Sequence, residues 1–210
     1  MKPFAITITR QFGSLGREIG KQLANRLHCH YYDRNVIEQE AAEKDASLAP
    51  LVALKQVEGY YKMAYPLGVG SSLKQDAMFQ AQSEVLLAHA AKENCVIVGR
   101  CADYVLRNQE RLLRCYIYAP DENRIANSIA SLDITATEYQ PLIETVDKAR
   151  AAYYQKYTGY PVDNLELRDL MINSACLGLE GTIDMLTAFA AKKFGLQLEK
   201  NTACPETKNQ

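Results

Sequence analysis

Apolar and polar positions along the chain follow two alternating patterns. Short runs of β-branched and apolar residues, typical of buried strands, are separated by longer segments with apolar positions every three or four residues, typical of helices. In the first long segment, Ile19, Leu23 and Leu27 are spaced to form one apolar stripe that packs on a sheet. Strands that alternate with helices indicate a mostly parallel sheet, so we predict an α/β fold.

The same pattern gives approximate element positions. The predicted strands are residues 4–9, about 29–32, 95–98, 114–119 and 170–173. The predicted helices are residues 17–27, 36–44, 76–92, 122–130, 137–156 and 180–193. Between 46 and 75 the pattern weakens into tyrosines, prolines and a Gly-Val-Gly-Ser-Ser run, which indicates an irregular or mobile insertion. The polar end of the chain, 199–210, is predicted to fray.

Composition narrows the class of protein. A chain of 210 residues, 48% hydrophobic and 23% charged, has the length and composition of one globular domain. Its formal net charge of -1 gives no general attraction to nucleic acid or to an anionic membrane. No run approaches about 18 uninterrupted apolar residues, and the first apolar run is too short for a signal peptide. We therefore predict a soluble cytoplasmic protein without a nucleic-acid or membrane partner, which must hold any anion locally.

Cysteine and histidine positions favour structure over metal or disulfide chemistry. The six cysteines contain no C-x-x-C pair and mostly lie in or beside apolar runs, which predicts buried, reduced thiols. His28 and His30 flank Cys29 and resemble a small metal cluster. Alternation along a strand would place the two histidines on one face and the cysteine on the other, so the structural interpretation is preferred.

Most of the candidate chemistry lies where the first predicted strand ends. A strand, a glycine-containing turn and a helix in succession aim backbone N–H groups and the positive end of the helix at one point, which suits a phosphate. Gly13 and Gly16 allow a close approach, and Arg17, in the first helical turn, is better placed if an anion lies there. Two alternatives remain: Glu18 neutralises Arg17, or the turn only connects a strand to a helix. The predicted phosphate-binding loop consists of Gln11, Phe12, Gly13, Ser14, Leu15, Gly16, Arg17 and Glu18.

This loop departs from the common phosphate-binding pattern G-x-x-x-x-G-K-[ST]. Gln11 replaces the first glycine, Arg17 the lysine, and Glu18 the hydroxyl residue that binds Mg²⁺. Arginine is permanently charged and can hold phosphate with its forked donors. The carboxylate of Glu18 would either bind Mg²⁺ directly or repel the phosphates, so position 18 is the more serious change.

Five blocks of sequence, in one order, resemble the motifs of the cytidylate-kinase-like family. The blocks are RQFGS and GREIG within 10–20, YYD at 31–33, CVIVGRCADYVL at 95–106, DKARAAYY at 147–154 and DLMINS at 169–174. The resemblance spans about residues 4–190, and the family typically has the same residue types at Arg17 and Glu18. It implies a P-loop three-layer sandwich with a five-stranded, mostly parallel sheet, and ATP and Mg²⁺ as cofactors.

The resemblance further implies the layout and activity of a nucleoside monophosphate kinase. One domain would cover 1–198, with an acceptor-binding insertion at 36–75 and a short helical lid region at 124–160, followed by the flexible tail 199–210. The implied reaction transfers the terminal phosphoryl group of ATP to a nucleoside monophosphate or a similar small acceptor.

Arg100, Asp103 and Asp33 are the candidates on the acceptor side. Arg100 follows an apolar strand and a glycine, where the resemblance implies that it grips the acceptor phosphate and that Asp103 orients it. The alternative for Arg100 is a solvent-exposed turn. Asp33 ends the second strand, where it would hold an acceptor hydroxyl or a Mg²⁺-bound water, or else cap the helix that follows.

Asp147 and Arg150 are the lid candidates, three residues apart on one predicted helix. As a bare pair they would form an exposed salt bridge that contributes little. The resemblance implies instead that Arg150 reaches the donor phosphates, with Asp147 orienting it, and that Arg124 frames the base of the donor nucleotide or begins the lid. By this resemblance, the catalytic residues are Arg17, Arg150, Asp147 and Asp33.

Two departures from the family separate two functional hypotheses. Asn127, Ser128 and Ser131 stand where further basic lid residues are common, and Arg168 stands where the family often has tyrosine. Fewer positive charges over the donor would weaken phosphoryl transfer. The first hypothesis is therefore a kinase, and the second is a catalytically weak or inactive nucleotide-binding regulatory protein. Either would bind a nucleotide or another small phosphorylated substrate, and apolar positions on the long helices could support a homodimer.

Overall fold

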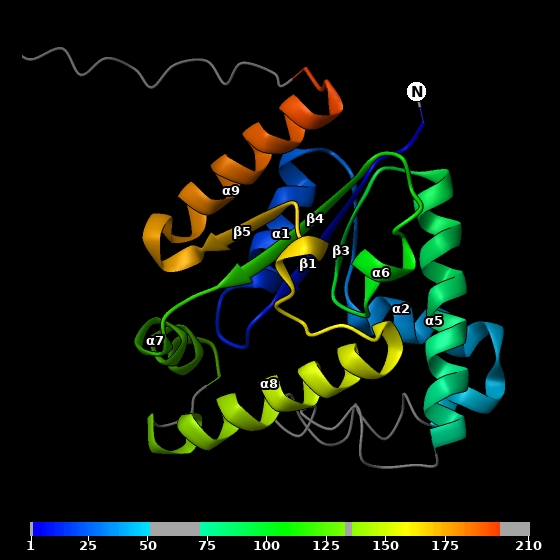
Figure 1. Cartoon of the computed structure of the whole chain (residues 1–210), viewed down its shortest axis with the longest axis horizontal. Helices are drawn as coiled ribbons and strands as arrows, with labels where there is room; N and C mark the ends of the chain where they lie inside the picture. The colour runs from blue at the N-terminus through cyan, green and yellow to red at the C-terminus, as the bar shows by residue number, and fades with distance from the viewer. Residues whose placement is uncertain (1, 51–71, 133–135, 198–210) are drawn as a thin grey trace, which may run out of the picture.

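The computed structural model describes residues 2–50, 72–132 and 136–197, which form an α/β sandwich (Figure 1). In this part of the chain, five parallel strands form one sheet in the order β2-β3-β1-β4-β5. The strands are β1 (Ala5–Arg10), β2 (His30–Tyr32), β3 (Cys95–Val98), β4 (Leu112–Tyr118) and β5 (Leu170–Asn173). Because every pairing is parallel, the carboxyl ends of the strands meet at one edge. The predicted α/β class is confirmed.

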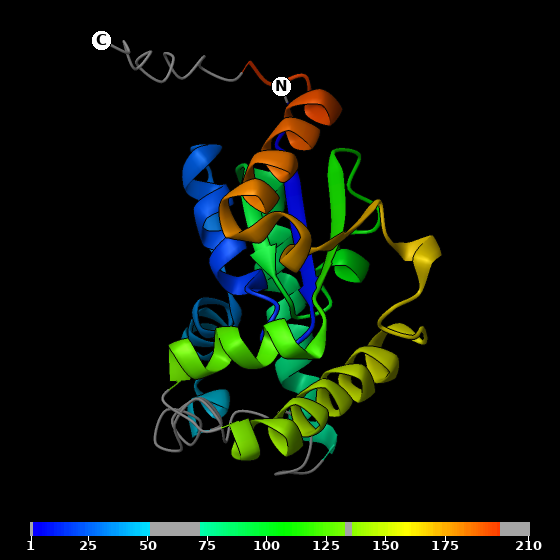
Figure 2. The same cartoon turned by 90° about the vertical axis from the view of Figure 1, so that its left-hand side faces the viewer.

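Helices cover both faces of this sheet. They are α1 (Gly16–Arg26), α2 (Arg34–Lys44), α5 (Ser72–Lys92), α6 (Ala102–Val105), α7 (Asp121–Leu132), α8 (Ala136–Thr158) and α9 (Ser174–Phe194), with short 3-10 turns at Ala46–Leu48 and Leu165–Leu167. α1 and α9 pack on one face, and α2, α5 and α6 pack on the other (Figure 1 and Figure 2). α8 crosses beyond the carboxyl ends of the strands. None of these helices is long and apolar enough to cross a membrane.

Alternation along β1 explains how one strand serves both layers. Ile6 and Ile8 face the side on which Ile19 and Leu23 of α1 pack, so two residues of the predicted apolar stripe are buried there, while the third, Leu27, is half-buried just after the helix. Ala5, one position away, belongs to the core on the opposite face. Apart from Leu27, all of these side chains are fully buried. Side chains two residues apart in the strand therefore pack against side chains four residues apart in the helix, in one core.

Several element boundaries differ from the sequence-based expectation. β3 and β5 are as predicted, but β1 begins one residue later, β4 begins two residues earlier, and α6 was not predicted because four residues are too few to show a helical period. α9 extends from Ser174 rather than from 180, but Gly178 has non-helical dihedrals (φ 66°, ψ -173°) that kink it, and the part after this kink agrees with the predicted helix 180–193. The tyrosine-rich and glycine-rich part of the predicted insertion, within 51–71, and the tail 199–210 lie outside the described residues.

The interpretation of the cysteines is confirmed for most positions, whereas the reasoning about the histidines is corrected. His28 has a left-handed φ of 50° and precedes β2, so it does not alternate with His30 along a strand. Cys95, Cys101 and Cys115 are buried, Cys29 is half-buried and Cys176 is exposed, and these five cysteines are free thiols. In the three buried cysteines and Cys29, burial raises the pKa of the thiol to about 12.

Gly20 tests the close packing of α1 on the sheet. A Cβ atom at this position would lie 2.6 Å from Cγ2 of Val98. We expect Gly20→Val to lower the free energy of unfolding by about 2–3 kcal/mol, because the helix must move away from the sheet. Urea denaturation would measure the change, with Lys21→Val on the exposed side of the same turn as the control. Equal effects of the two substitutions would contradict this packing argument.

Thiol reactivity tests the burial of the cysteines. With a thiol pKa of about 12, Cys101 carries little thiolate at pH 8. We expect iodoacetamide to modify it on the order of 10³-fold more slowly than an ordinary thiol of pKa about 8.5, and about tenfold faster for each pH unit between 8 and 10. Peptide mass spectrometry would follow Cys101 and the exposed Cys176 in the native protein, with urea-unfolded protein as the reference. Rapid labelling of native Cys101 would contradict its burial.

Candidate functional site

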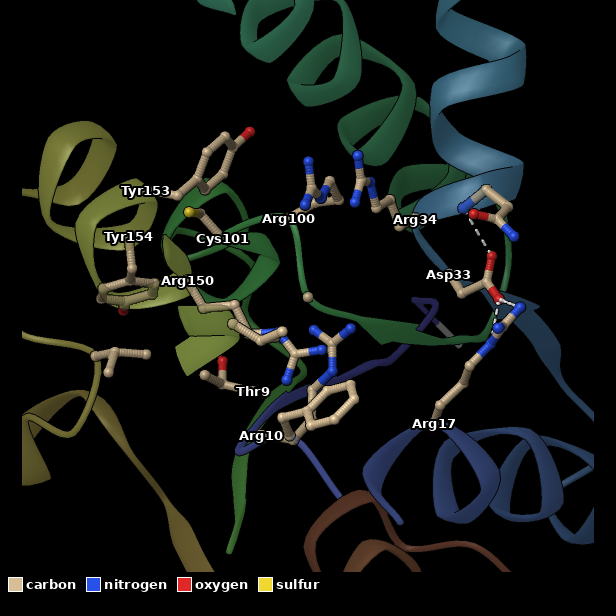
Figure 3. A pocket seen from close by; sticks show the side chains of 15 residues that line it. Thr9, Arg10, Arg17, Asp33, Arg34, Arg100, Cys101, Arg150, Tyr153 and Tyr154 are labelled. Atoms are coloured by element: carbon tan, nitrogen blue, oxygen red, sulfur yellow. Dashed lines mark hydrogen bonds and ion pairs between the residues drawn. The ribbon is translucent and has the colours of Figure 1, made fainter. Parts of the chain in front are cut away.

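A cavity of about 100 Å³ opens at the carboxyl edge of the sheet (Figure 3). Residues from β1, the loop that follows it, α1, α2, the turn after β3 and α8 line it. Asp33 is its one acidic lining residue in the described part of the chain. Five lining residues are arginines: Arg10, Arg17, Arg34, Arg100 and Arg150. This excess of guanidinium groups over carboxylates suits a ligand with several negative charges, such as a phosphorylated molecule.

The phosphate-loop region is held in place by contacts to three other segments. Gly13 (φ 76°) and Leu15 (φ 62°) have left-handed dihedrals, and a Cβ atom at Gly13 would lie 2.1 Å from the hydroxyl oxygen of Tyr139 in α8. The hydroxyl of Ser14 donates to the carbonyl of Ile117, and the hydroxyl of Ser174 donates to the carbonyl of Ser14. The turn therefore approaches its neighbours more closely than a side chain at position 13 would allow, and α1 begins directly after it.

Asp33 connects Arg17 to the start of α2. One carboxylate oxygen accepts the amide N–H groups of Asn35 and Val36, which confirms the helix-cap interpretation. The other oxygen lies 2.9 Å from Nε and 2.6 Å from Nη2 of Arg17. Glu18 instead accepts a hydrogen bond from Gln22, so the alternative in which Glu18 neutralises Arg17 is wrong.

Arg100 points into the protein rather than into solvent. Gly99, Arg100 and Cys101 all have positive φ, and this tight turn brings the Arg100 side chain back over the ring of Tyr153, 4.7 Å from its centroid. Only 12% of the Arg100 side chain is exposed, so the alternative of a solvent-exposed turn is wrong.

Glu38, on α2, is the buried carboxylate that joins Arg100 to Arg34. Its Oε1 lies 3.1 Å from Nη1 of Arg100 and 3.0 Å from Nε of Arg34. Burial and the positive charge of Arg100 lower the pKa of Arg34. Both guanidinium groups nevertheless stay charged, because the pKa of arginine lies far above neutrality. The two arginines therefore present positive charge to the cavity from a rigid, shared support.

Asp103 does not orient Arg100, contrary to the expectation from the sequence. Its carboxylate pairs with Arg168 and accepts a hydrogen bond of 2.7 Å from the hydroxyl of Tyr154. The side chains of Asp103 and Arg168 are 3% and 1% exposed. Burial disfavours the charge on Arg168, but the negative charge of Asp103 outweighs it and raises the pKa of Arg168. This buried ion pair connects α6 to the segment before β5.

Asp147 ties the phosphate loop to α8. It accepts the N–H of Phe12 at 2.9 Å, pairs with Arg124, and lies 3.7 Å from Nη1 of Arg150. The predicted Asp147–Arg150 pair is therefore present, but it is half-buried and part of a network. Arg124 is 4% exposed and donates to the carbonyl of Phe12 at 2.7 Å. It supports the loop through this contact, and its expected role in framing the donor base or beginning the lid stays a prediction.

Sequence reasoning missed four residues that shape the cavity. Arg10 ends β1, Arg34 follows Asp33, and Glu38 and Tyr153 hold Arg100. Arg10 and Arg34 had a usable signal, because each stands at the carboxyl end of a predicted strand, as Arg100 does. Glu38 and Tyr153 had none, since their importance comes from contacts with residues 62 and 53 positions away along the chain.

Among the residues that the structure describes, the side chains do not form a preformed site for Mg²⁺. Glu18 is exposed, bonds Gln22 and does not line the cavity. In the described ranges, no group of three or more histidine, cysteine, aspartate or glutamate side chains is arranged to hold a metal ion. Magnesium commonly binds proteins through one or two carboxylates together with substrate phosphates. Any Mg²⁺ would therefore have to arrive with a phosphorylated ligand.

Comparison with known proteins places the chain in a family. A sequence model of the cytidylate kinase-like family matches residues 5–175. The chain belongs to this family. No curated protein matches the sequence. Among solved structures, an uncharacterized protein from Eubacterium ventriosum superimposes with a TM-score of 0.70 at 18% identity, covering 89% of this chain and 98% of that one.

Two kinases of known name share the fold. Shikimate kinase from Bacteroides thetaiotaomicron superimposes with a TM-score of 0.54 at 12% identity, covering 92% of this chain and 99% of that one. A gluconokinase from Sinorhizobium meliloti superimposes with a TM-score of 0.55 at 10% identity, covering 92% and 97%. At these identities the likeness establishes the fold. Together with the family match, it makes the chain a P-loop kinase-like protein.

The Asp103–Arg168 pair provides a test of the corrected assignment. We expect Asp103→Asn to lower the free energy of unfolding by about 3–5 kcal/mol, because Arg168 would keep a buried charge without its partner. Urea denaturation would measure the loss. Asp184→Asn, which breaks an exposed pair with Arg26, is the matched control and should leave stability almost unchanged. A stable Asp103→Asn protein that has lost anion binding would instead support the expectation that Asp103 orients Arg100.

Proposed function

We propose that this protein is an ATP-dependent phosphotransferase that acts on a nucleoside monophosphate or another small phosphorylated acceptor. The observation that supports it most strongly is the convergence of five arginines on one cavity beside the glycine turn. They come from β1, α1, α2, the turn after β3 and α8, and the fold must hold their positive charges together against mutual repulsion. A structure that maintains this arrangement is well suited to bind two phosphorylated molecules next to each other.

The proposed reaction is a direct transfer between the two ligands. An oxygen of the acceptor attacks the γ-phosphorus of ATP, the bond from that phosphorus to the β–γ bridging oxygen breaks, and ADP leaves. The loop at 11–16 and the start of α1 would hold the donor phosphates. Arg150 would stabilise charge on the group in transfer, and Asp147 would orient it from the loop side. ATP would be used as its Mg²⁺ complex.

The environment of Asp33 favours a phosphate acceptor over a hydroxyl acceptor. A hydroxyl group must lose its proton during transfer, and a general base needs a free carboxylate oxygen to receive it. Both oxygens of Asp33 already accept hydrogen bonds, one from Arg17 and the other from amides of α2. A phosphate monoester is largely ionised near pH 7 and needs no base. Arg100 and Arg34, held by Glu38, are the proposed contacts for the acceptor phosphate.

A second candidate function is a nucleotide-binding regulatory protein with little or no turnover. The orientation of Glu18 favours it, because this carboxylate stands where P-loop kinases have a Mg²⁺-binding hydroxyl and is turned to Gln22. Such a protein would keep the binding cavity and lose the charge stabilisation that transfer needs.

A coupled assay with MgATP and a panel of nucleoside monophosphates tests the enzyme. We expect ADP formation that depends on the acceptor and that Arg150→Ala reduces about 10²–10³-fold in kcat, because a charge-stabilising donor is lost. Lys148→Ala, exposed on the same helix, should behave as wild type. Thermal stabilisation by ATP without turnover would favour the regulatory protein instead. Neither stabilisation nor turnover would refute both functions.

A further inference from the structure

Arg10 occupies a space that two glycines leave open for it. It is the last residue of β1, paired in register with Ile117. A Cβ atom at Gly16 would lie 2.7 Å from Cβ of Arg10, and one at Gly99 would lie 2.3 Å from its Nη1. Both distances are too short for real Cβ contacts. Gly16 therefore leaves room for the base of the Arg10 side chain, and Gly99 leaves room for its guanidinium group.

The Arg10 guanidinium points to the same part of the cavity as that of Arg150. Figure 3 shows the two side chains converging from β1 and α8, on the side opposite Arg34 and Arg100. Arg150 is held there by the ring of Phe12, 5.5 Å from its guanidinium carbon. Arg150 also lies 3.7 Å from Asp147, and an anion between the two guanidinium groups would contact both of them.

Arg17 points to a different wall. Its guanidinium lies against Asp33, whose carboxylate is fixed by the amides at the start of α2. The loop arginine, which by its position in the motif is expected to hold the donor phosphate, is therefore paired at the start of α2 and lies apart from Arg10 and Arg150 (Figure 3). Arg10 takes the place next to the loop.

We propose that Arg10 and Arg150 form a subsite for one tetrahedral phosphoryl group, the terminal phosphoryl of the donor, and that Arg17 belongs to the acceptor wall. This subsite rests on the proposed phosphotransferase function, and it assigns Arg10 as a catalytic residue that touches the group in transfer. Its ligand class is a phosphoryl anion with at least two free oxygens, since two forked guanidinium groups converge on it.

Binding of inorganic pyrophosphate, measured by isothermal titration calorimetry, tests the subsite without any need for turnover. We expect Arg10→Met to weaken binding about 10–100-fold, because a charge-assisted contact is lost. Arg107→Met, which removes one exposed arginine outside the cavity, should bind as wild type does. Arg17→Met should weaken pyrophosphate binding less than Arg10→Met. Wild-type affinity in Arg10→Met, or no pyrophosphate binding by the wild type, would overturn the subsite.

Two further variants, Arg10→Lys and Arg150→Met, and a folding control separate lost binding from lost folding. The melting temperature of each ligand-free variant shows whether it is folded. Arg10→Lys keeps the positive charge but lacks the two-pronged guanidinium, so it should bind pyrophosphate with intermediate affinity. In a double-mutant cycle, Arg10→Met and Arg150→Met should be non-additive, because both arginines contact one group. Additive effects of the two substitutions would place them at separate sites and overturn the proposal.

Kinetics separate the subsite from the function on which it rests. If the protein is a phosphotransferase, Arg10→Met should lower kcat about 10²-fold and leave the KM of the acceptor unchanged, whereas Arg17→Met should raise that KM. Robust turnover that does not change in Arg10→Met would contradict the subsite but not the phosphotransferase function. Pyrophosphate binding that depends on Arg10, without turnover on any monophosphate, would contradict the phosphotransferase function but not the subsite.

Discussion

Holding five arginines at one edge of a sheet is the physical constraint on which the rest of this structure depends. Guanidinium groups in a partly buried cavity repel one another, so the protein must supply negative charge without filling the cavity. Three carboxylates do this: Asp33, in the cavity wall, pairs with Arg17, Glu38 joins Arg34 to Arg100, and Asp147 joins Arg124 to Arg150. Apart from Asp33, the described charged side chains that line the cavity are arginines.

Each of these carboxylates also fastens two parts of the fold. Asp33 caps α2, Glu38 connects α2 to the turn after β3, and Asp147 connects α8 to the N–H of Phe12 in the loop. The positions of the arginines are therefore linked to the packing of the helices that carry them. The same helices serve two purposes, since α1 and α2 line the cavity at the edge of the sheet and also pack apolar cores on its two faces.

Local chemistry made several parts of the site predictable. Asp33 is an N-cap by its residue type and by its place before a helical segment, and its side chain accepts the expected amides. Arg100 follows a fully apolar strand and a glycine, which favours a place at the carboxyl edge. Asp103 was misassigned for a physical reason: its partner Arg168 is 65 residues away, and proximity in sequence suggested Arg100 instead.

The sequence by itself determined the α/β class and the apolar faces of the strands and helices, because these depend on a spacing of two or about four residues along one segment. The family motifs are read directly from the residues. Tertiary structure alone decided which charges meet. Arg17 turns to Asp33 rather than to Glu18, and Arg10 enters the cavity because Gly16 and Gly99 leave room for it. Ion pairing and steric exclusion act over a few ångströms in space, between side chains of different elements, so the spacing within one element does not encode them.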